Sequence, residues 1–378
     1  MRVFFVSHVS EKYGGGRSLL DLIDGLLRRG IECYVVMPRQ GPLMKEFKDR
    51  HIECGILPIK SWAFSGKMSL KHILCGGLNI FSSLIVAIKA YFWKADIIYS
   101  NSSIIPVGAL AAFFGRKPHI WHIREFGEED YGLSFDLGER LSRRLMGWLS
   151  FRVIVISDAL RQKYSLYISN KKLIMIYDAV SAPGQSCVSV DSKIPILAII
   201  GLIHPAKGQM EAVLAIADLV GRGILVKLKI LGGEGNSEYF RQLKYVIIQN
   251  KIADYVEFAG YVDDTAPFYS SADIILVCSR HEAFGRVAVE GMLFEKPIIG
   301  VRSGATPELI REGFNGLLYE PGNYRELAEK IMYLVERPEE AKRMGENGFR
   351  EASEKYTIEK CANEVYKILQ EVVKSKNK

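Results

Sequence analysis

Two glutamates, Glu282 and Glu290, are eight positions apart in the segment SRHEAFGRVAVEGM (residues 279–292). The β-rich residues 273–277 ahead of them favour a strand, and the apolar pattern after Gly285 favours a helix. Glu290 interrupts an apolar neighbourhood, and a carboxylate on a buried face needs partners. An ion pair with a nearby lysine or arginine explains Glu290 alone equally well, and a helix-cap charge explains Glu282 alone equally well. Together they suit a cleft in which both carboxylates accept hydrogen bonds from ligand hydroxyl groups.

The same segment offers a site for phosphate. The backbone amides of Phe284, Gly285 and Arg286 are expected to point outward at the start of the helix, where anions bind readily. Earlier in the same half, Lys207-Gly208 stands at another predicted helix start just after a strand. Its ammonium group can reach an anionic ligand, although a helix-start lysine in solvent is the alternative.

Two loops of the first half are further candidates. Gly14, Gly15 and Gly16 follow the first predicted strand and precede an amphipathic helix, so their amides can approach a phosphate. They do not form the G-x-G-x-x-G fingerprint, and a flexible turn is the alternative. His122 and Arg124 come at the end of a strand and share a face if the strand continues that far. A histidine packed in the core is the competing interpretation.

These loops need strands and helices to position them, and the chain alternates the two. In the first half the expected strands are residues 2–7, 31–37, 96–100, 118–122, 152–156 and 173–177, and in the second half they are 195–200, 225–231, 255–260, 273–277, 297–301 and 316–319. Helical patterns between them predict an α/β fold with doubly wound parallel sheets. Because ligands bind beyond the carboxyl ends of such strands, the chemistry belongs in the loops that leave them.

The alternation stops at a turn-rich stretch and then restarts, which predicts two Rossmann-like domains facing a central cleft. We expect an N-terminal domain over residues 1–183, a linker over 184–193 and a C-terminal domain over 194–355. Past Glu320 the sequence pattern predicts helices only. We expect the last helix, 356–378, to pack back toward the N-terminal domain.

Composition and charge limit the class of protein. The six cysteines of the 378 residues are far apart, without a Cys/His cluster, which argues against a structural metal and suits a reducing cytoplasm. The start of the chain, MRVFFVSH, runs directly into a strand pattern, so we expect no signal peptide. Residues 1–190 carry 25 Lys and Arg against 16 Asp and Glu. This basic half suits an anionic partner such as a pyrophosphate or a phospholipid surface, but it lacks the motifs of nucleic-acid binding.

One apolar segment raises the question of a membrane. Residues 73–88 carry no charge, although Asn79 and a serine pair interrupt the run. A spanning helix needs about 20 predominantly apolar residues. We therefore expect a largely buried helix here, with contact to a membrane surface as the alternative.

The block from Glu282 to Glu290, followed by EKPIIGVRSGATPELIREGFNGLLYEPGN, resembles glycosyltransferase family 4, whose retaining enzymes use nucleotide sugars and have the GT-B fold. The early glycine loop, RVIVISDAL and Lys207-Gly208 come in the family's order, so the resemblance covers nearly the whole chain. It implies that Glu290 binds the ribose hydroxyls and that Glu282 lies by the donor sugar. Lys207 and the amides of Phe284 and Gly285 would hold the diphosphate.

The resemblance also implies roles for the first domain and shows departures. Gly15 and its neighbours would approach the diphosphate, and His122 would lie beside the reacting sugar. Where the family commonly has an arginine, this chain has Leu202, and Arg280, Arg286 or Arg17 are candidates to compensate. Asp178 stands where the family often has Asn-Gly.

The function implied is a metal-independent hexosyl transfer from a nucleoside-diphosphate sugar, with a UDP-sugar favoured over a GDP-sugar. We expect no cofactor, no metal and no nucleic-acid partner. The expected acceptor is a glycan or a polyprenyl-diphosphate-linked glycan of O-antigen or capsule biosynthesis, reached from the cytoplasm at the inner face of the membrane. A sugar-nucleotide epimerase or hydrolase of the same fold, and a non-catalytic nucleotide-sugar-binding protein, are the alternatives.

Overall fold

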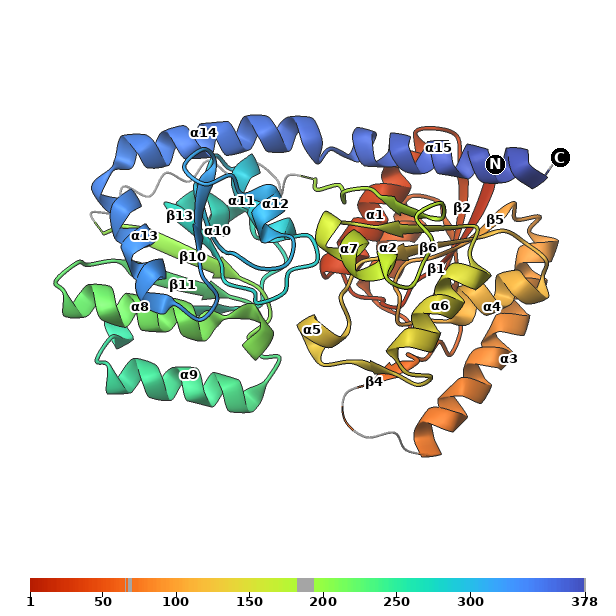
Figure 1. The fold of residues 1–378 in the computed structure, drawn as a ribbon, viewed down its shortest axis with the longest axis horizontal. Helices are drawn as coiled ribbons and strands as arrows, with labels where there is room; N and C mark the ends of the chain where they lie inside the picture. The colour runs from red at the N-terminus through yellow and green to blue at the C-terminus, as the bar shows by residue number, and fades with distance from the viewer. Residues whose placement is uncertain (65, 67–69, 182–193, 377–378) are drawn as a thin grey trace. The chain divides into compact units, whose positions relative to one another are not determined.

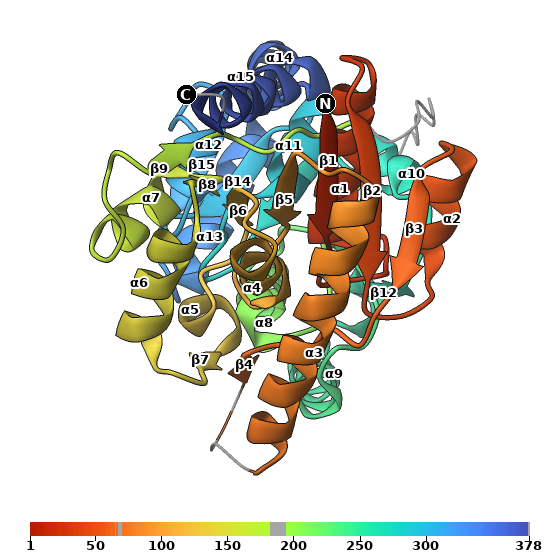
Figure 2. The same ribbon diagram turned by 90° about the vertical axis from the view of Figure 1, so that its right-hand side faces the viewer.

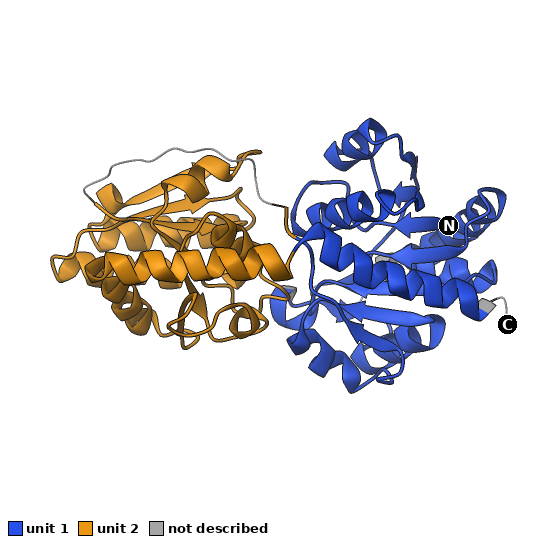
Figure 3. Cartoon of the chain, turned by 90° about the horizontal axis from the view of Figure 1, so that it is seen from above, with its two compact units in different colours: residues 1–179, 357–378 blue, residues 180–356 orange. Residues whose placement is uncertain are grey.

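The computed structural model describes residues 1–64, 66, 70–181 and 194–376 and forms two compact units (Figure 3). Unit 1 contains Met1–Ala179 and Thr357–Lys378, and unit 2 contains Val180–Tyr356. The predicted linker 184–193 lies outside the described residues. Each unit is built around one parallel sheet, which confirms the predicted doubly wound α/β class.

Unit 1 has a seven-stranded parallel sheet in the order β3-β2-β1-β5-β6-β8-β9. The strands are β1 (Arg2–Val6), β2 (Glu32–Met37), β3 (Glu53–Ile56), β5 (Ile97–Ser100), β6 (His119–Ile123), β8 (Arg152–Val155) and β9 (Leu173–Met175), and a small antiparallel pair joins β4 (Ala63–Phe64) to β7 (Ser134–Phe135). The central strands are mostly apolar, and all their residues except Arg2 are buried, because helices cover both faces of the sheet.

The helices of unit 1 divide between the two faces of this sheet (Figures 1 and 2). They are α1 (Gly14–Leu27), α2 (Pro42–Asp49), α3 (Leu70–Phe92), α4 (Val107–Phe114), α5 (Glu128–Tyr131), α6 (Glu139–Leu149), α7 (Asp158–Ser165) and α15 (Ile358–Lys376). Leu22 of α1 and Leu369 of α15 share one core with Phe5, whereas Val86 of α3 and Ala111 of α4 share a second core with Phe4. The two faces of β1 therefore belong to two separate cores.

Helix α3 corrects one prediction, because it is not largely buried. Its inner side contributes Val86 and Ala90 to the core, but Leu74, Phe81 and Ile88 are 66%, 57% and 57% exposed. The prediction was wrong because a mostly apolar run does not reveal which face of a helix is covered. By length and composition, the stretch Leu74–Phe92 is also apolar enough to cross a membrane.

Unit 2 has a six-stranded parallel sheet in the order β12-β11-β10-β13-β14-β15. Its strands are β10 (Ile196–Ile200), β11 (Lys227–Leu231), β12 (Val256–Gly260), β13 (Ile274–Val277), β14 (Ile298–Val301) and β15 (Gly316–Tyr319). Its helices are η1 (Pro205–Lys207), α8 (Gln209–Gly221), α9 (Ser237–Gln249), η2 (Ala253–Tyr255), α10 (Ala266–Ser271), α11 (Arg286–Leu293), α12 (Thr306–Leu309), α13 (Tyr324–Glu336) and α14 (Pro338–Lys355). Strands β10 and β13 are neighbours, so the loops that leave their carboxyl ends lie side by side.

Candidate functional site

In unit 2 the loops after β10 and β13 bring together two of the predicted site residues. Lys207 Nζ lies 3.0 Å from Glu282 Oε2, and the two side chains are 26% and 21% exposed. Gly208 makes this approach feasible because its φ is +69° and a Cβ there would lie 2.1 Å from the carbonyl oxygen of Cys278. The turn after β10 therefore packs directly against the end of β13. This contact places a cation and a carboxylate at the carboxyl ends of the two strands.

The loop after β14 fixes the backbone of Glu282. Gly304 has φ +57°, and a Cβ at this residue would lie 2.5 Å from the carbonyl oxygen of Glu282. The amide of Ala305 donates to that same oxygen at 2.8 Å. Three consecutive strands, β10, β13 and β14, thus hold the Lys207–Glu282 pair.

Helix α11 begins where the sequence predicts, at Gly285. This residue is the N-cap in the left-handed conformation, with φ +104°, and a Cβ there would lie 2.8 Å from Leu309 Cδ1 and 3.5 Å from Glu282 Cγ. The Phe284 side chain is buried and its ring lies 5.6 Å from that of Tyr356. The first turn of α11 carries backbone amides that have no partner within the helix, next to Glu282.

Glu290 is buried and has partners within unit 2. Its Oε2 accepts a hydrogen bond from the Tyr269 hydroxyl at 2.7 Å, and Arg286 Nη2 lies 3.6 Å from its Oε1. An ion pair with an arginine, the alternative explanation for this carboxylate, is therefore present. The assignment of Glu290 as the ribose anchor stays a prediction.

In unit 1, helix α1 begins at Gly14, three residues earlier than the sequence suggested, so the three glycines form its first turn. Gly16 is required by contact, because a Cβ there would lie 2.2 Å from the carbonyl oxygen of Glu11, whereas a Cβ at Gly14 would meet nothing within 4 Å. A Cβ at Gly15 would lie 3.1 Å from the His8 ring. This tight packing explains glycine in a helix despite its low helix propensity.

His122 is fully buried in β6 and lies in a polar network. Its Nδ1 is 2.7 Å from the Tyr99 hydroxyl and 3.1 Å from Arg124 Nη2. Because a guanidinium group only donates, Nδ1 is the acceptor and the proton belongs on Nε2. Burial, together with the positive charge of Arg124, holds the pKa of His122 well below its usual value. The ring is therefore neutral around neutral pH.

Arg124 connects this histidine to the glycine loop. It forms an ion pair with Asp178, and its Nε donates to Asn101 Oδ1 at 2.8 Å. Asn101 Nδ2 in turn donates to the carbonyl oxygen of Gly15 at 3.2 Å. Asp178, which stands where the resembled family often has Asn-Gly, thus has a structural role, since its carboxylate is the counterion of the buried Arg124.

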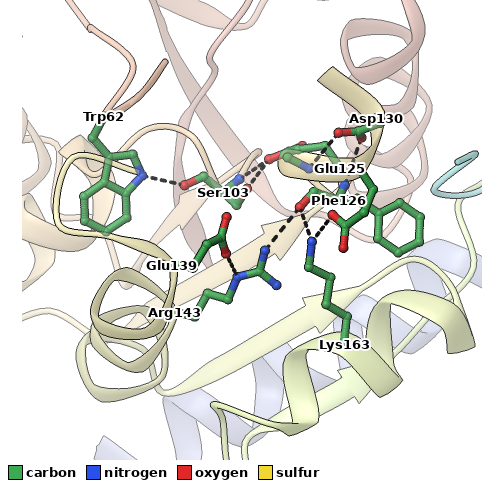
Figure 4. Close-up of polar contacts among 10 residues, drawn as sticks. Trp62, Ser103, Glu125, Phe126, Asp130, Glu139, Arg143 and Lys163 are labelled. Carbon is green, nitrogen blue, oxygen red and sulfur yellow. Dashed lines mark hydrogen bonds and ion pairs between the residues drawn. The ribbon is translucent and has the colours of Figure 1, made fainter. Parts of the chain in front are cut away.

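Glu125 organises the neighbouring loop after β5 (Figure 4). Its Oε1 accepts hydrogen bonds from the hydroxyl of Ser102 at 2.7 Å and from both the amide and the hydroxyl of Ser103. Asp130 accepts from the amides of Phe126 and Gly127. Burial and the nearby charge of Glu125 raise the pKa of Asp130 to about 6. A ring of acids and hydroxyls therefore borders the carboxyl ends of β5 and β6.

Sequence reasoning missed several residues of this network, namely Tyr99, Asn101, Ser102, Ser103 and Asp130. One signal was available: the polar run Ser100-Asn101-Ser102-Ser103 directly follows a strand, where ligands of parallel sheets bind. Among the residues that the structure describes, no group of three or more His, Cys, Asp or Glu side chains is arranged to hold a metal ion.

Two family models match the chain in succession. The model for Glycosyltransferase Family 4 matches residues 13–182, and the model for glycosyl transferases group 1 matches residues 188–351. An uncharacterized glycosyltransferase of Methanocaldococcus jannaschii is 29% identical over 280 residues, which are 73% of this chain and 76% of that protein. The capsular polysaccharide biosynthesis glycosyltransferase CapM of Staphylococcus aureus is 22% identical over 268 residues, or 66% of this chain and 70% of CapM.

A solved structure extends the likeness to the fold. HepE of Anabaena, crystallised in complex with UDP-glucose, matches with a TM-score of 0.81 over 98% of this chain and 100% of HepE, at 21% identity. Such a match shows that the two chains share the GT-B fold of two Rossmann-like domains.

Proposed function

The chain belongs to the glycosyltransferases that these models describe, family 4 in its first half and group 1 in its second, and from this premise we propose a specific reaction. It moves a hexose from a nucleoside-diphosphate sugar to a glycan acceptor with retention of anomeric configuration. A UDP-sugar is the favoured donor, because the neighbouring structure of HepE binds UDP-glucose. The observation that supports the proposal most is the Lys207–Glu282 pair beside the first turn of α11.

The arrangement in unit 2 suits departure of a diphosphate. Negative charge builds on the leaving phosphate, and Lys207 and the first-turn amides of α11 stabilise it, which is the largest contribution we assign to the protein. Glu282 then accepts hydrogen bonds from hydroxyls of the donor sugar, and Glu290 accepts them from the ribose. The leaving phosphate takes the proton of the acceptor hydroxyl on the same face, so the mechanism needs no protein nucleophile.

Unit 1 contributes a neutral histidine and a glycine turn. The proton on His122 Nε2 makes this nitrogen a donor toward the reacting sugar, while Arg124 and Tyr99 hold the other nitrogen. The first turn of α1 supplies the amides of Gly14 and Gly15 for the diphosphate, because the Gly16 amide already donates to the carbonyl oxygen of Tyr13 at 2.7 Å. The ring acts as a hydrogen-bond donor and not as a general acid, because its pKa is far below neutral.

Arg280 is the residue that we assign to compensate for Leu202. The Leu202 side chain packs against Gly235, because a Cβ added at Gly235 would lie 2.4 Å from it. Since leucine carries no charge, this position supplies no cation to the anion site. The amide of Arg280 donates to the carbonyl oxygen of Ala206 at 3.1 Å, next to Lys207, and its side chain is largely exposed. Arg286, by contrast, already faces Glu290.

The acceptor follows from the class of relatives. CapM is named for capsular polysaccharide biosynthesis, and a further relative, LpsE of Rhizobium meliloti, for the lipopolysaccharide core. We assign to this chain a glycan or a polyprenyl-diphosphate-linked glycan of a surface polysaccharide, such as an O-antigen or a capsule. The enzyme then works in the cytoplasm against the inner face of the membrane.

A donor panel tests the proposal. Purified protein is incubated with UDP-, GDP- and dTDP-sugars, with and without a lipid-linked glycan acceptor, and the products are identified by mass spectrometry. We expect a sugar added to the acceptor from a UDP-sugar. Turnover of the donor without an acceptor indicates an epimerase or a hydrolase. Nucleotide binding without turnover, together with an unchanged biological output in Glu282→Ala, indicates a non-catalytic binding protein.

A further inference from the structure

Helix α3 presents an apolar face to solvent. Leu74, Leu78, Phe81, Leu84, Ile88 and Phe92 recur at helical spacing and are all exposed. The stretch from Leu74 to Ile88 contains no charged residue at all. A contiguous apolar surface of this kind on a folded domain marks a place where another apolar phase or partner binds.

The surface continues onto the neighbouring helices. In Figure 2, α4 lies beside α3, and α6 lies on the other side of α4. Phe113 and Phe114 at the end of α4 are exposed, and the ring of Phe113 lies 5.9 Å from that of Trp148 on α6. Here Phe113 and Trp148 border a shallow hollow of about 580 Å³ together with Arg116 and Lys117. We call the exposed apolar residues of α3 with Phe113, Phe114 and Trp148 the apolar surface.

Cations surround the apolar surface. Lys89 and Lys94 lie at the end of α3, Arg116 lies just after α4, and Arg140 and Arg144 lie on the outer side of α6, all of them exposed. Residues 70–95 and 97–124 contain no Asp or Glu. Apolar and aromatic side chains bordered by cations, on helices α3 and α4 that carry no acid, complement a membrane that carries anionic lipid.

The inner side of α3 shows that the helix lies on its domain. Asn79 Oδ1 accepts from the amide of Lys60 at 2.9 Å, and the Ser82 hydroxyl donates to the carbonyl oxygen of Pro58 at 3.1 Å. Val86 and Ala90 on the same side are fully buried in the core. A spanning helix would have to break these contacts, so the geometry points to a helix that lies in the plane of the interface.

We propose that the apolar surface docks the protein on the anionic face of a lipid bilayer, with α3 parallel to the membrane. The apolar side chains enter the boundary of the acyl chains, and the surrounding lysines and arginines contact the lipid phosphates. A second copy of the chain is the poorer occupant, because a symmetric dimer through this surface brings its own cations together. The surface does not depend on the transfer chemistry, so vesicle binding tests it separately from the proposed function.

Flotation with lipid vesicles tests the docking surface. We expect the wild-type chain to float with phosphatidylcholine vesicles that contain phosphatidylglycerol, and much less with phosphatidylcholine alone. Phe81→Glu combined with Ile88→Glu places two charges in the apolar surface and lowers the bound fraction by about tenfold or more. Ile248→Glu is the matched control, since Ile248 is a 66% exposed residue of α9 in unit 2, and it leaves binding unchanged.

A second variant separates the electrostatic part. Lys89→Glu with Arg144→Glu is expected to reduce binding to the anionic vesicles and to weaken its dependence on salt. Circular dichroism and transfer to a soluble acceptor establish that the variants are folded. Three results overturn the proposal: no binding of the wild type, wild-type binding by the Phe81→Glu, Ile88→Glu variant, or membrane-bound protein that alkaline carbonate does not release. A dimer in solution that the same variant dissociates, without vesicle binding, assigns the surface to a second copy instead.

Discussion

At the scale of single residues, Lys207 is central to the proposed chemistry. It is a cation at the end of a sheet, 26% exposed, and it forms an ion pair with Glu282. We expect Lys207→Ala to lower kcat by about 10²–10³-fold, because it removes one stabilising donor from the leaving diphosphate. Lys244→Ala on α9, which removes a lysine that lies over the Phe240 ring, is the control and keeps wild-type turnover. Equal rates for the two variants would contradict the assignment.

Asp130 gives a prediction for the effect of pH on stability. Its pKa is raised from 3.8 to about 6 by burial first and by the charge of Glu125 second. A group with a raised pKa in the folded state stabilises the fold below its unfolded pKa, and this contribution is lost as pH rises through the folded pKa. The free energy of unfolding should therefore fall between about pH 4 and pH 7 through this residue.

Asp130→Asn should remove that part of the pH dependence, because the side chain is then neutral throughout. Chemical denaturation of the wild type and the variant across this range measures the effect. Asp158→Asn is the control, because hydrogen bonds from Gln162 and Arg161 lower the pKa of Asp158. The contribution of Asp158 to the free energy of unfolding therefore changes with pH in the opposite direction. Parallel pH profiles for wild type and Asp130→Asn would show that Asp130 titrates normally.

At the scale of elements, the loop after β14 is expected to act by holding Glu282. Gly304→Ala and Gly313→Ala each place a Cβ at positive φ, at +57° and +73°, and each should cost about 1 kcal/mol of stability. A Cβ at Gly304 also collides with the Glu282 backbone, whereas a Cβ at Gly313 meets nothing within 4 Å. Gly304→Ala should therefore reduce kcat/KM by about tenfold or more, and Gly313→Ala should not. An equal loss of activity in both variants would contradict the assignment that the loop after β14 holds Glu282 in place for the reaction.

The elements also show what the sequence can predict. The twelve expected strands are present within one or two residues at each end, because β-branched runs between helical patterns are a strong signal. The short strands β3, β4 and β7 were missed, since segments such as Glu53–Ile56 and Ala63–Phe64 have no clear alternation. Glu282, Gly285 and Lys207 lie near one another because they follow adjacent strands. Partners from distant segments, such as Asn101 and Asp178 for Arg124, depend on tertiary contacts that spacing does not contain.

At the scale of the whole molecule, the last helix belongs to the first unit. Helix α15 buries Val365 and Leu369 in the core of unit 1, and a Cβ at Gly25 of α1 would lie 2.4 Å from Ala362 Cβ. The chain thus begins and ends in the same unit. We expect Leu369→Ala to lower the free energy of unfolding of unit 1 by about 2–5 kcal/mol.

All four tryptophans, Trp62, Trp93, Trp121 and Trp148, lie in unit 1, so their fluorescence during denaturation reports on this unit alone. Leu166→Ala is the matched control, because this leucine of unit 1 is 75% exposed, and it should leave the transition unchanged. A Leu369→Ala transition that coincides with the wild type would show that α15 adds nothing to the stability of unit 1.

The anomeric configuration of the product tests the central claim most directly. The protein is supplied with the donor that the panel identifies and with its acceptor, and the new glycosidic bond is read by nuclear magnetic resonance at the earliest detectable conversion. The account predicts an acceptor-dependent product whose anomeric configuration equals that of the donor. An inverted product, or no transfer from any nucleotide sugar together with no nucleotide binding, would contradict it.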